Sequence, residues 1–444
     1  MLRASSELAH PMYKNNPRSP SRRPSSRNES DSASPSRRGS AGMSVRQGEY
    51  RLPEDVSRRV RLGHPWVFGD ALAPRKVSEK TGTIVDLVSR TGGFIARAYT
   101  DADHAVALRV LSRNPRENLT PGSGTIADRF TTAVKLRWHV LGSQRPTALR
   151  LFSGENEGLP GVTVDRYGDF VVVQWLSAGA LAWREELYEA ITQTVEPRGI
   201  YEQKRIRPLA GEAPCPGTRA VGEEAPLDVI VEEADCSFAV DVSAPLGIGF
   251  FPDMRLGRDA VAKRATDRRV LNLFSYTGAF SVRAAKAGAA EVVAVDSLAK
   301  VHAKARHNYE LSGLDPNKME QVTSDAMKAL ERFADRKRSF DLIVCDPPTF
   351  SHAQGSGKPF SATQDLAHLA KACIDVLEPG GFLAFATNAA KLSAPEVDRA
   401  LAEGAAEAFS ELRIVERHGL PPDFPVSPGF PEGNYLKFVL AVKL

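Results

Sequence analysis

The sequence predicts an α/β protein whose C-terminal half is a seven-stranded sheet, preceded by a small β-barrel and a central α+β domain. Three observations carry this prediction. From residue 245 onward, short apolar runs alternate with amphipathic stretches, as strands and helices do around a parallel sheet. The segment RVLNLFSYTGAF, 269–280, joins an apolar strand to a helix through a tight turn. Before residue 116, glycines punctuate several strand-like runs, and 444 residues suffice for two to four domains.

The composition is that of an ordinary globular protein, and its excess positive charge lies in an N-terminal tail. Hydrophobic residues make up 42% of the chain and charged residues 25%. Residues 1–42 hold 8 basic and 3 acidic residues, whereas the remainder holds 50 and 51. This tail is rich in Ser, Arg and Pro, so we expect it to be disordered. It is either an arm for RNA or a dispensable extension, with Met43 as an alternative first residue.

The cysteine pattern and the hydropathy exclude two further classes of protein. The four cysteines show no CxxC spacing, so we expect neither a metal site nor disulfides, and a reducing cytoplasm fits. No uninterrupted apolar run approaches 18 residues, so no membrane span is predicted. We therefore expect a cytoplasmic location.

Residues 45–115 are predicted to form the β-barrel, which carries an aromatic motif, GHPWVF, at 63–68. Two interpretations of Trp66 stay open. Its ring stacks on a splayed RNA base, with Arg58, Arg59 and Arg61 beside it for the phosphates. Alternatively, Trp66 belongs to the barrel core, which the sequence alone favours.

Residues 118–244 are predicted to form the central α+β domain. A helix is expected over 118–143 and another over WREELYEAITQTV, with strands in between and after. GENEGLPG, 154–161, is interpreted as a glycine-rich loop. The segment 208–227 is expected to be an exposed, mobile excursion.

Residues 245–444 are predicted to form a Rossmann-like domain. Five strands alternate with helices, and two late strands, ELRIVERHG and YLKFVLAVKL, follow with no helix between them. Seven strands with a terminal hairpin are typical of a class I methyltransferase, whereas a dehydrogenase uses six parallel strands. Gly278 is a single glycine where the dinucleotide motif requires three, so an NAD enzyme is not favoured.

Polar residues follow the first four strands of this domain, at the edge where such sheets bind ligands. A carboxylate after strand 2 can take both ribose hydroxyls, one after strand 3 can accept from an adenine amino group, and Asp-Pro-Pro stiffens the exit of strand 4. Any single acid here could be a helix N-cap, but polar residues in register after all four strands indicate an S-adenosylmethionine (SAM) site. The predicted cofactor residues are Phe274, Ser275, Tyr276, Thr277, Gly278, Asp296, Ser297, Asp325, Ala326 and Asp346.

Residues 45–444 resemble the bacterial large-subunit ribosomal RNA methyltransferases of the cytosine-C5 family. The matching motifs are GHPWVF, GENEGLPGVTVDRYG, LNLFSYTGAF, VVAVD, VCDPPTF and PEGNYLK, 431–437. The resemblance implies a PUA domain, a central domain and a SAM-binding domain, with ribosomal RNA or its precursor particle as the partner. It also implies that GFFPDMR, 249–255, reaches over the cofactor with Phe251, Asp253 and Arg255. Asn272 occupies a place where many such enzymes carry an acid.

One departure from that family concerns the acceptor atom. Enzymes that methylate cytosine C5 first add a cysteine thiolate to the base, and relatives carry that cysteine just after strand 5. Here the segment is Ala386-Thr387-Asn388-Ala389-Ala390-Lys391. The local motifs resemble a guanine-N7 methyltransferase domain instead, and N7 needs no covalent help. We therefore predict a non-covalent mechanism in which Asn388 and Lys391 hold the base edge.

The predicted catalytic group is Asp346, Pro347, Pro348, Phe350 and Asn388. Asp346 would orient the base or the methyl donor, and Phe350 would stack on a flipped-out base. Three alternatives stay open: a cytosine-C5 enzyme with an unidentified nucleophile, methylation of DNA or protein, and a SAM-binding RNA assembly factor without turnover. A homodimer is a further option that the sequence does not decide.

Overall fold

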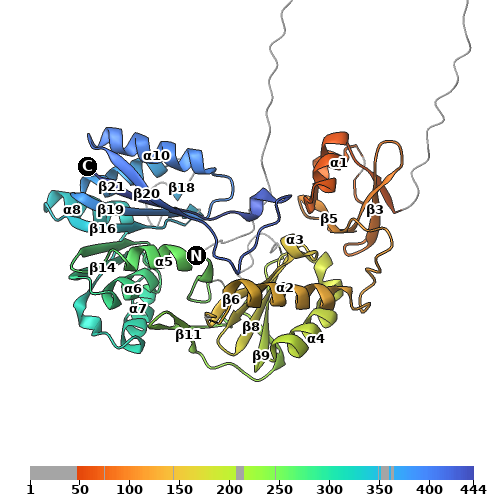
Figure 1. The fold of residues 1–444 in the computed structure, drawn as a ribbon, viewed down its shortest axis with the longest axis horizontal. Helices are drawn as coiled ribbons and strands as arrows, with labels where there is room; N and C mark the ends of the chain where they lie inside the picture. Colours follow the sequence, from red (N-terminus) through yellow and green to blue (C-terminus); the bar gives the residue numbers. More distant parts are fainter. Residues whose placement is uncertain are drawn as a thin grey trace, which may run out of the picture.

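The computed structural model describes residues 48–74, 76–143, 145–206, 215–245, 247–348, 350–351, 360–361 and 365–444. The predicted tail, 1–42, lies outside the described residues, as do residues 208–214 of the expected excursion 208–227. Figure 1 shows three bodies in chain order, with the large sheet domain at the left and the small N-terminal domain at the upper right. A dark blue segment near the C-terminus extends from the large sheet toward the other two bodies.

The N-terminal domain is a five-stranded sheet in the order β1-β3-β4-β5-β2. Its elements are β1 (Glu49–Arg51), α1 (Glu54–Arg61), β2 (Trp66–Phe68), β3 (Ile84–Val88), β4 (Phe94–Thr100) and β5 (Val106–Ser112). The helix α1 was not expected from the sequence. Its acidic first turn and basic last turn suit the helix dipole, and it buries Val56 and Val60 while its arginines face outward.

The central domain is a second five-stranded sheet, in the order β10-β9-β8-β7-β6. Its elements are α2 (Thr125–Leu141), β6 (Ala148–Ser153), α3 (Gly154–Glu157), β7 (Val162–Tyr167), β8 (Phe170–Trp175), α4 (Arg184–Val195), β9 (Gly199–Lys204) and β10 (Thr218–Gly222). Two expectations are wrong in part. The glycine-rich motif begins with the short helix α3, and β10 pairs antiparallel with β9 inside the supposed excursion.

A hairpin follows, made of β11 (Val229–Glu233) and β12 (Cys236–Val240). Phe238 and Val240 of β12 are buried in the same apolar cluster as Val292 of the large sheet. The hairpin therefore packs on the methyltransferase-like sheet domain, although it precedes the predicted boundary at residue 244. The three domain limits given by the sequence stay a prediction.

The C-terminal domain confirms the predicted α/β fold. Its sheet runs β15-β14-β13-β16-β19-β21-β20, with β21 antiparallel to both of its neighbours. The strands are β13 (Arg269–Leu273), β14 (Glu291–Asp296), β15 (Met319–Thr323), β16 (Phe340–Cys345), β19 (Leu377–Thr387), β20 (Leu412–His418) and β21 (Lys437–Lys443). Its helices are α5 (Arg255–Ala262), α6 (Ala279–Lys286), α7 (Ala299–Leu311), α8 (Ala326–Asp335), α9 (Leu366–Asp375) and α10 (Ala394–Glu407). A two-residue pair, β17 (Phe350–Ser351) and β18 (Phe360–Ser361), lies between β16 and α9.

The two faces of this sheet build two separate cores. Val270 of β13 belongs to a cluster with helices α5 to α7, whereas Leu271 and Leu273 pack toward α8, α9 and α10. This alternation is what a strand covered on both faces requires. Among the described residues no helix combines the length and the apolar character needed to cross a membrane.

Candidate active site

The loop after β13 has an unusual backbone. Phe274 and Tyr276 have positive φ angles of 54° and 48°, which residues other than glycine rarely adopt. Gly278 follows with φ 80° and forms the N-cap of α6, and a Cβ atom there would lie 2.9 Å from the Cβ of Ala305. The sharp turn therefore presses the loop against α7. Such strain persists where surrounding contacts fix it, and it is typical of ligand-binding loops.

Those fixing contacts come from three directions. The hydroxyl of Thr277 donates to the carbonyl oxygen of Gly249 at 2.5 Å, and the Thr277 carbonyl accepts from the Asn308 amide of α7 at 2.8 Å. The backbone N–H of Ser275 donates to Val295 of β14. The Ser275 hydroxyl is buried and has no hydrogen-bond partner, which is costly unless a ligand supplies one.

Asp296 ends β14 directly beside this loop. Its two carboxylate oxygens accept backbone N–H groups from Tyr276 and Leu298, each at 2.9 Å. A carboxylate offers about four lone-pair positions, so two remain for further donors. Asp296 is partly exposed and Ser297 beside it is exposed. Both predicted residues therefore lie together at the carboxyl ends of β13 and β14.

Asp325 and Asn272 have local roles that the sequence did not establish. The side chain of Asp325 accepts from the Lys328 N–H at 3.2 Å and caps α8, while Ala326 is buried. Asp325 is therefore a helix N-cap, which is the alternative that the sequence offered for any single acid here. Its side chain is also exposed, so it remains accessible to a ligand. The buried Asn272 amide donates to Ser281 of α6 at 2.9 Å, and a cofactor contact by Asn272 stays a prediction.

Asp346 follows β16 and faces a second carboxylate. Burial, reinforced by the negative charge of Asp253, raises the pKa of Asp346 to about 7, and Arg258 opposes the shift. Asp253 in turn accepts a hydrogen bond from the Tyr435 hydroxyl at 2.6 Å. Pro347 is buried and Pro348 partly so, which fixes the backbone where β16 leaves the sheet. Thr349 and the side chain of Phe350 lie outside the described residues.

The GFFPDMR segment packs against the loop after β13, and its reach over the cofactor stays a prediction. Phe251 is 54% exposed, and its ring centre lies 5.5 Å from that of Tyr276. Burial, followed by smaller effects of Asp296 and Asp241, raises the pKa of Tyr276 to about 12, so this hydroxyl stays neutral. Arg255 forms an ion pair with Asp423, although one of its terminal nitrogens is buried without a partner. A cofactor contact by Arg255 stays a prediction.

Comparisons with known proteins agree with this geometry. A model of S-adenosylmethionine-dependent methyltransferases matches residues 193–435, and a PUA-like domain model matches residues 51–113. The chain belongs to the S-adenosylmethionine-dependent methyltransferases. The family expected from the motifs is thus confirmed, together with SAM as the cofactor.

The relatives of this methyltransferase extend over most of its length. The Ribosomal RNA large subunit methyltransferase I of Shewanella denitrificans is 32% identical over 394 residues, which cover 88% of this chain and 98% of the relative. The protein of the same name from Cronobacter sakazakii is 33% identical and covers 84% of this chain and 94% of its own. A crystal structure of a protein assigned as a methyltransferase and complexed with SAH has a TM-score of 0.80 at 25% identity, covering 89% of this chain and all of the other.

The residues present fit the cofactor of this family. The orphaned Ser275 hydroxyl and the free lone pairs of Asp296 offer polar partners at the edge where strand ends converge. The exposed ring of Phe251 offers an apolar cover beside Tyr276. We assign Ser275, Asp296 and Asp325 as the residues that would hold the adenosine part, and this assignment stays a prediction.

The residues predicted to hold the acceptor base follow the end of β19. Asn388 and Lys391 are both exposed there, and the Lys437 ammonium donates to the Ala389 carbonyl at 3.1 Å between them. That ammonium also donates to the Tyr435 carbonyl, so the turn after β19 is fixed to the segment that holds Tyr435. Asn388 and Lys391 therefore lie on a turn held by Lys437, and their contact with a base stays a prediction.

The cysteines are not placed for covalent catalysis. Cys345 and Cys373 are fully buried in the core between the sheet and helices α8 to α10. Burial raises the pKa of Cys345 well above its ordinary value, and it raises that of Cys236 to about 11. Cys215 is exposed, but it precedes β10 of the central domain. The interpretation of Cys345 and Cys373 as core residues is confirmed.

Of the two interpretations of Trp66, burial is the one that this structure supports. Its side chain is only 5% exposed, because Phe430 covers it with a ring-centre distance of 4.6 Å in an edge-to-face arrangement. Trp66 packs on Val106 and Phe68 of the N-terminal domain and on Phe430 of the C-terminal segment. Arg59 is also engaged, by His64 and Glu432, whereas Arg58 and Arg61 are exposed on α1.

Several residues of this region escaped the sequence reasoning, namely Arg150, Asp165, Asp423 and Tyr435. They lie where the central domain meets the segment 419–436, and their contacts join positions far apart in the chain. The motif PEGNYLK was the one available signal. It marked resemblance to a family, but nothing local linked it to Asp253.

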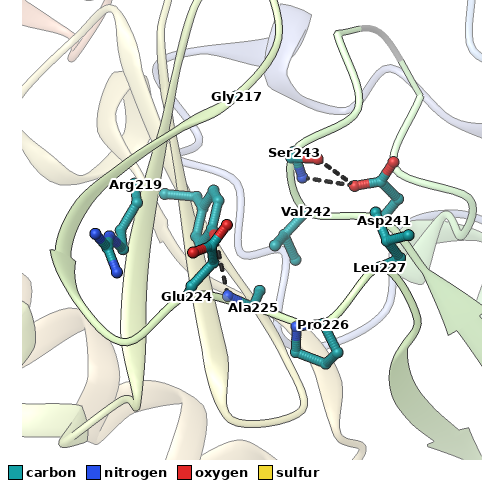
Figure 2. A pocket seen from close by; sticks show the side chains of 10 residues that line it. Gly217, Arg219, Glu224, Ala225, Pro226, Leu227, Asp241, Val242 and Ser243 are labelled. Atoms are coloured by element: carbon teal, nitrogen blue, oxygen red, sulfur yellow. Dashed lines mark hydrogen bonds between the residues drawn. The ribbon is translucent and has the colours of Figure 1, made fainter.

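The described residues also line a cavity of about 360 Å³ beside β9, β10 and the residues after β12. Figure 2 shows Arg219 and Glu224 on one side of it and Asp241 with Ser243 on the other. None of the predicted site residues lines it. Among the described residues no group of three or more His, Cys, Asp or Glu is arranged to hold a metal ion.

Proposed function

We propose that this methyltransferase modifies a base of large-subunit ribosomal RNA, in the cytoplasm, by direct in-line methyl transfer to a flipped-out base. The observation that carries the substrate class is the match to relatives named Ribosomal RNA large subunit methyltransferase I over 88% of the chain, PUA-like domain included. SAM, when bound, supplies an electrophilic methyl group on a sulfonium. The chain's own residues position the two reactants, and positioning accounts for most of the catalysis.

In this proposal the two sides of the site have separate tasks. Ser275 and Asp296 bind the adenosine part, and Asp346 lies at the methyl-donor end. Its neighbouring carboxylate makes the pocket negative, which suits a sulfonium. Asn388 and Lys391 hold the edge of the base. The base leaves its stack, because its target atom cannot be reached inside a duplex.

A nitrogen acceptor is favoured over cytosine C5. A C5 mechanism needs a thiolate beside the base. All four cysteines of the chain are either buried in cores or placed in the central domain, and the residues after β19 contain no cysteine. The alternatives of a C5 enzyme with another nucleophile and of an assembly factor without turnover remain outcomes of the test below. The oligomeric state, with a homodimer as one option, is tested by sedimentation of the purified chain.

Transfer of labelled methyl groups tests this proposal. Purified protein is incubated with tritiated SAM and large-subunit ribosomal RNA, with DNA and protein as parallel acceptors. We expect label in the RNA alone, and nucleoside analysis of that RNA to show a methyl group on nitrogen. Label in DNA or protein would contradict the substrate, and a 5-methylcytosine product would contradict the acceptor atom.

A further inference from the structure

The connection between β20 and β21, residues 419–436, runs from the methyltransferase sheet across both other domains. Figure 1 shows it as the dark blue segment that leaves the sheet and passes between them. At its far point Phe430 covers Trp66, and Glu432 lies 3.2 Å from the His64 ring nitrogen Nε2. That hydrogen bond is the main reason why the pKa of Glu432 is lowered. The motif GHPWVF is thus a docking site for this connection.

The central domain holds the same connection at two further points. The backbone N–H of Ser427 donates to the Asn156 side chain at 2.8 Å. The fully buried Asp423 accepts the backbone N–H of Arg150 at 3.3 Å and pairs with Arg255. The Arg150 guanidinium lies 4.8 Å from the ring centre of Phe424. The connection is therefore fixed by residues of all three domains.

The connection returns to the active site at Tyr435. Its hydroxyl donates to the Asp253 carboxylate at 2.6 Å, and Asp253 is the charged neighbour of Asp346. We propose that Tyr435 is a positioning residue for methyl transfer, which holds the Asp253 carboxylate beside Asp346 so that the donor end of the pocket stays negative. This inference rests on the proposed function, because it assigns Asp346 to the methyl donor.

The charge environment of the Asp253–Asp346 pair is shared by several elements. The groups that face it are Arg150 of β6, Asp165 and Tyr167 of β7, Arg258 of α5, Cys345 of β16 and Tyr435. Arg150 is already bound to Asp165 through two hydrogen bonds, and Arg258 to Glu233. The Tyr435 hydroxyl is therefore the neutral donor that fixes Asp253 without cancelling its charge.

The sign of the expected effect follows from the sulfonium charge. Without the hydroxyl, the Asp253 carboxylate loses the hydrogen bond that fixes it, and its displacement weakens the negative field at the donor end. SAM, which is cationic, then loses affinity, whereas SAH lacks the charge and does not. Removing the neighbouring charge also makes Asp346 ionise at lower pH. The pH midpoint of SAM binding therefore moves down.

Calorimetric titration of Tyr435→Phe with SAM and with SAH, between pH 6 and 8.5, tests the inference. We expect the SAM affinity to fall about fivefold, which corresponds to the net free energy of one hydrogen bond. The SAH affinity should change less than twofold, and the pH midpoint of SAM binding should move to lower pH. Tyr188→Phe is the matched control, because it removes a tyrosine–carboxylate bond of 2.7 Å to Glu202 in the central domain. Tyr188→Phe should change the affinity for neither SAM nor SAH.

A double mutant separates positioning from general damage. If Tyr435 acts through Asp253, Tyr435→Phe adds less than twofold to the SAM affinity loss of Asp253→Asn. Equal losses for SAM and SAH, an unmoved midpoint or full additivity would overturn the inference while leaving the proposed RNA substrate intact, because RNA is absent from the titration. Failure of the native chain to bind SAM would overturn both.

Discussion

Gly429→Ala is expected to release the β20–β21 connection from the N-terminal domain. A Cβ atom at this position would lie 2.2 Å from the carbonyl oxygen of Leu62 and 2.6 Å from the Cα of Gly63. Both atoms belong to the backbone and cannot rotate away, so the connection must lift. Overpacking of this kind costs about 1–3 kcal/mol. If overpacking raises the free energy of the docked state by about 2 kcal/mol, the undocked population rises roughly 30-fold.

Hydrogen exchange measures that population directly. The N–H groups of Phe430 and Gly433, which bond to Ser427 and Phe430, should exchange roughly 30-fold faster in Gly429→Ala. Gly419→Ala is the matched control in the same connection, since its Cβ would meet its nearest neighbour at an ordinary 3.6 Å. Unchanged exchange in Gly429→Ala, or equal acceleration in both variants, would refute the docking described here.

Three further results are expected. Asp296→Ala should weaken SAM binding about tenfold or more with little loss of fold, because it removes an acceptor and two loop contacts; unchanged affinity by calorimetry would count against the assignment. SAM affinity should rise with pH through about 7 as Asp346 ionises, while SAH affinity stays flat; a flat SAM profile would remove Asp346 from the donor end. Cys345→Ser and Cys373→Ser should retain methylation, and a loss of methylation with intact SAM affinity would favour a covalent mechanism.

The first five strands of the C-terminal domain could be predicted because each is a local apolar run that alternates with a helix. The short helix α1 could not, because its eight residues contain just two buried valines and follow Pro53. β10 was missed for a similar reason. Its five residues are almost all exposed, so pairing with β9 and not burial makes it a strand.

The cofactor edge was also predictable, since parallel strands bring Ser275 and Asp296 to one edge. The residues that act between domains were not. His64 and Glu432 are 368 positions apart, and Asp253 and Tyr435 are 182 apart. Each motif shows a local pattern, yet no pattern in the chain says that GHPWVF and PEGNYLK meet. Both interpretations of Trp66 therefore stayed open in the sequence, and nothing in it showed that Phe430 covers this ring.

Nucleoside mass spectrometry of large-subunit ribosomal RNA from a deletion strain tests the central claim most directly. The account predicts that one methylated nucleoside, carrying its methyl group on nitrogen, is missing in the deletion strain. It should return on complementation with the native gene and not with an Asp346→Asn variant. Unchanged methylation of this RNA in the deletion strain would contradict the account.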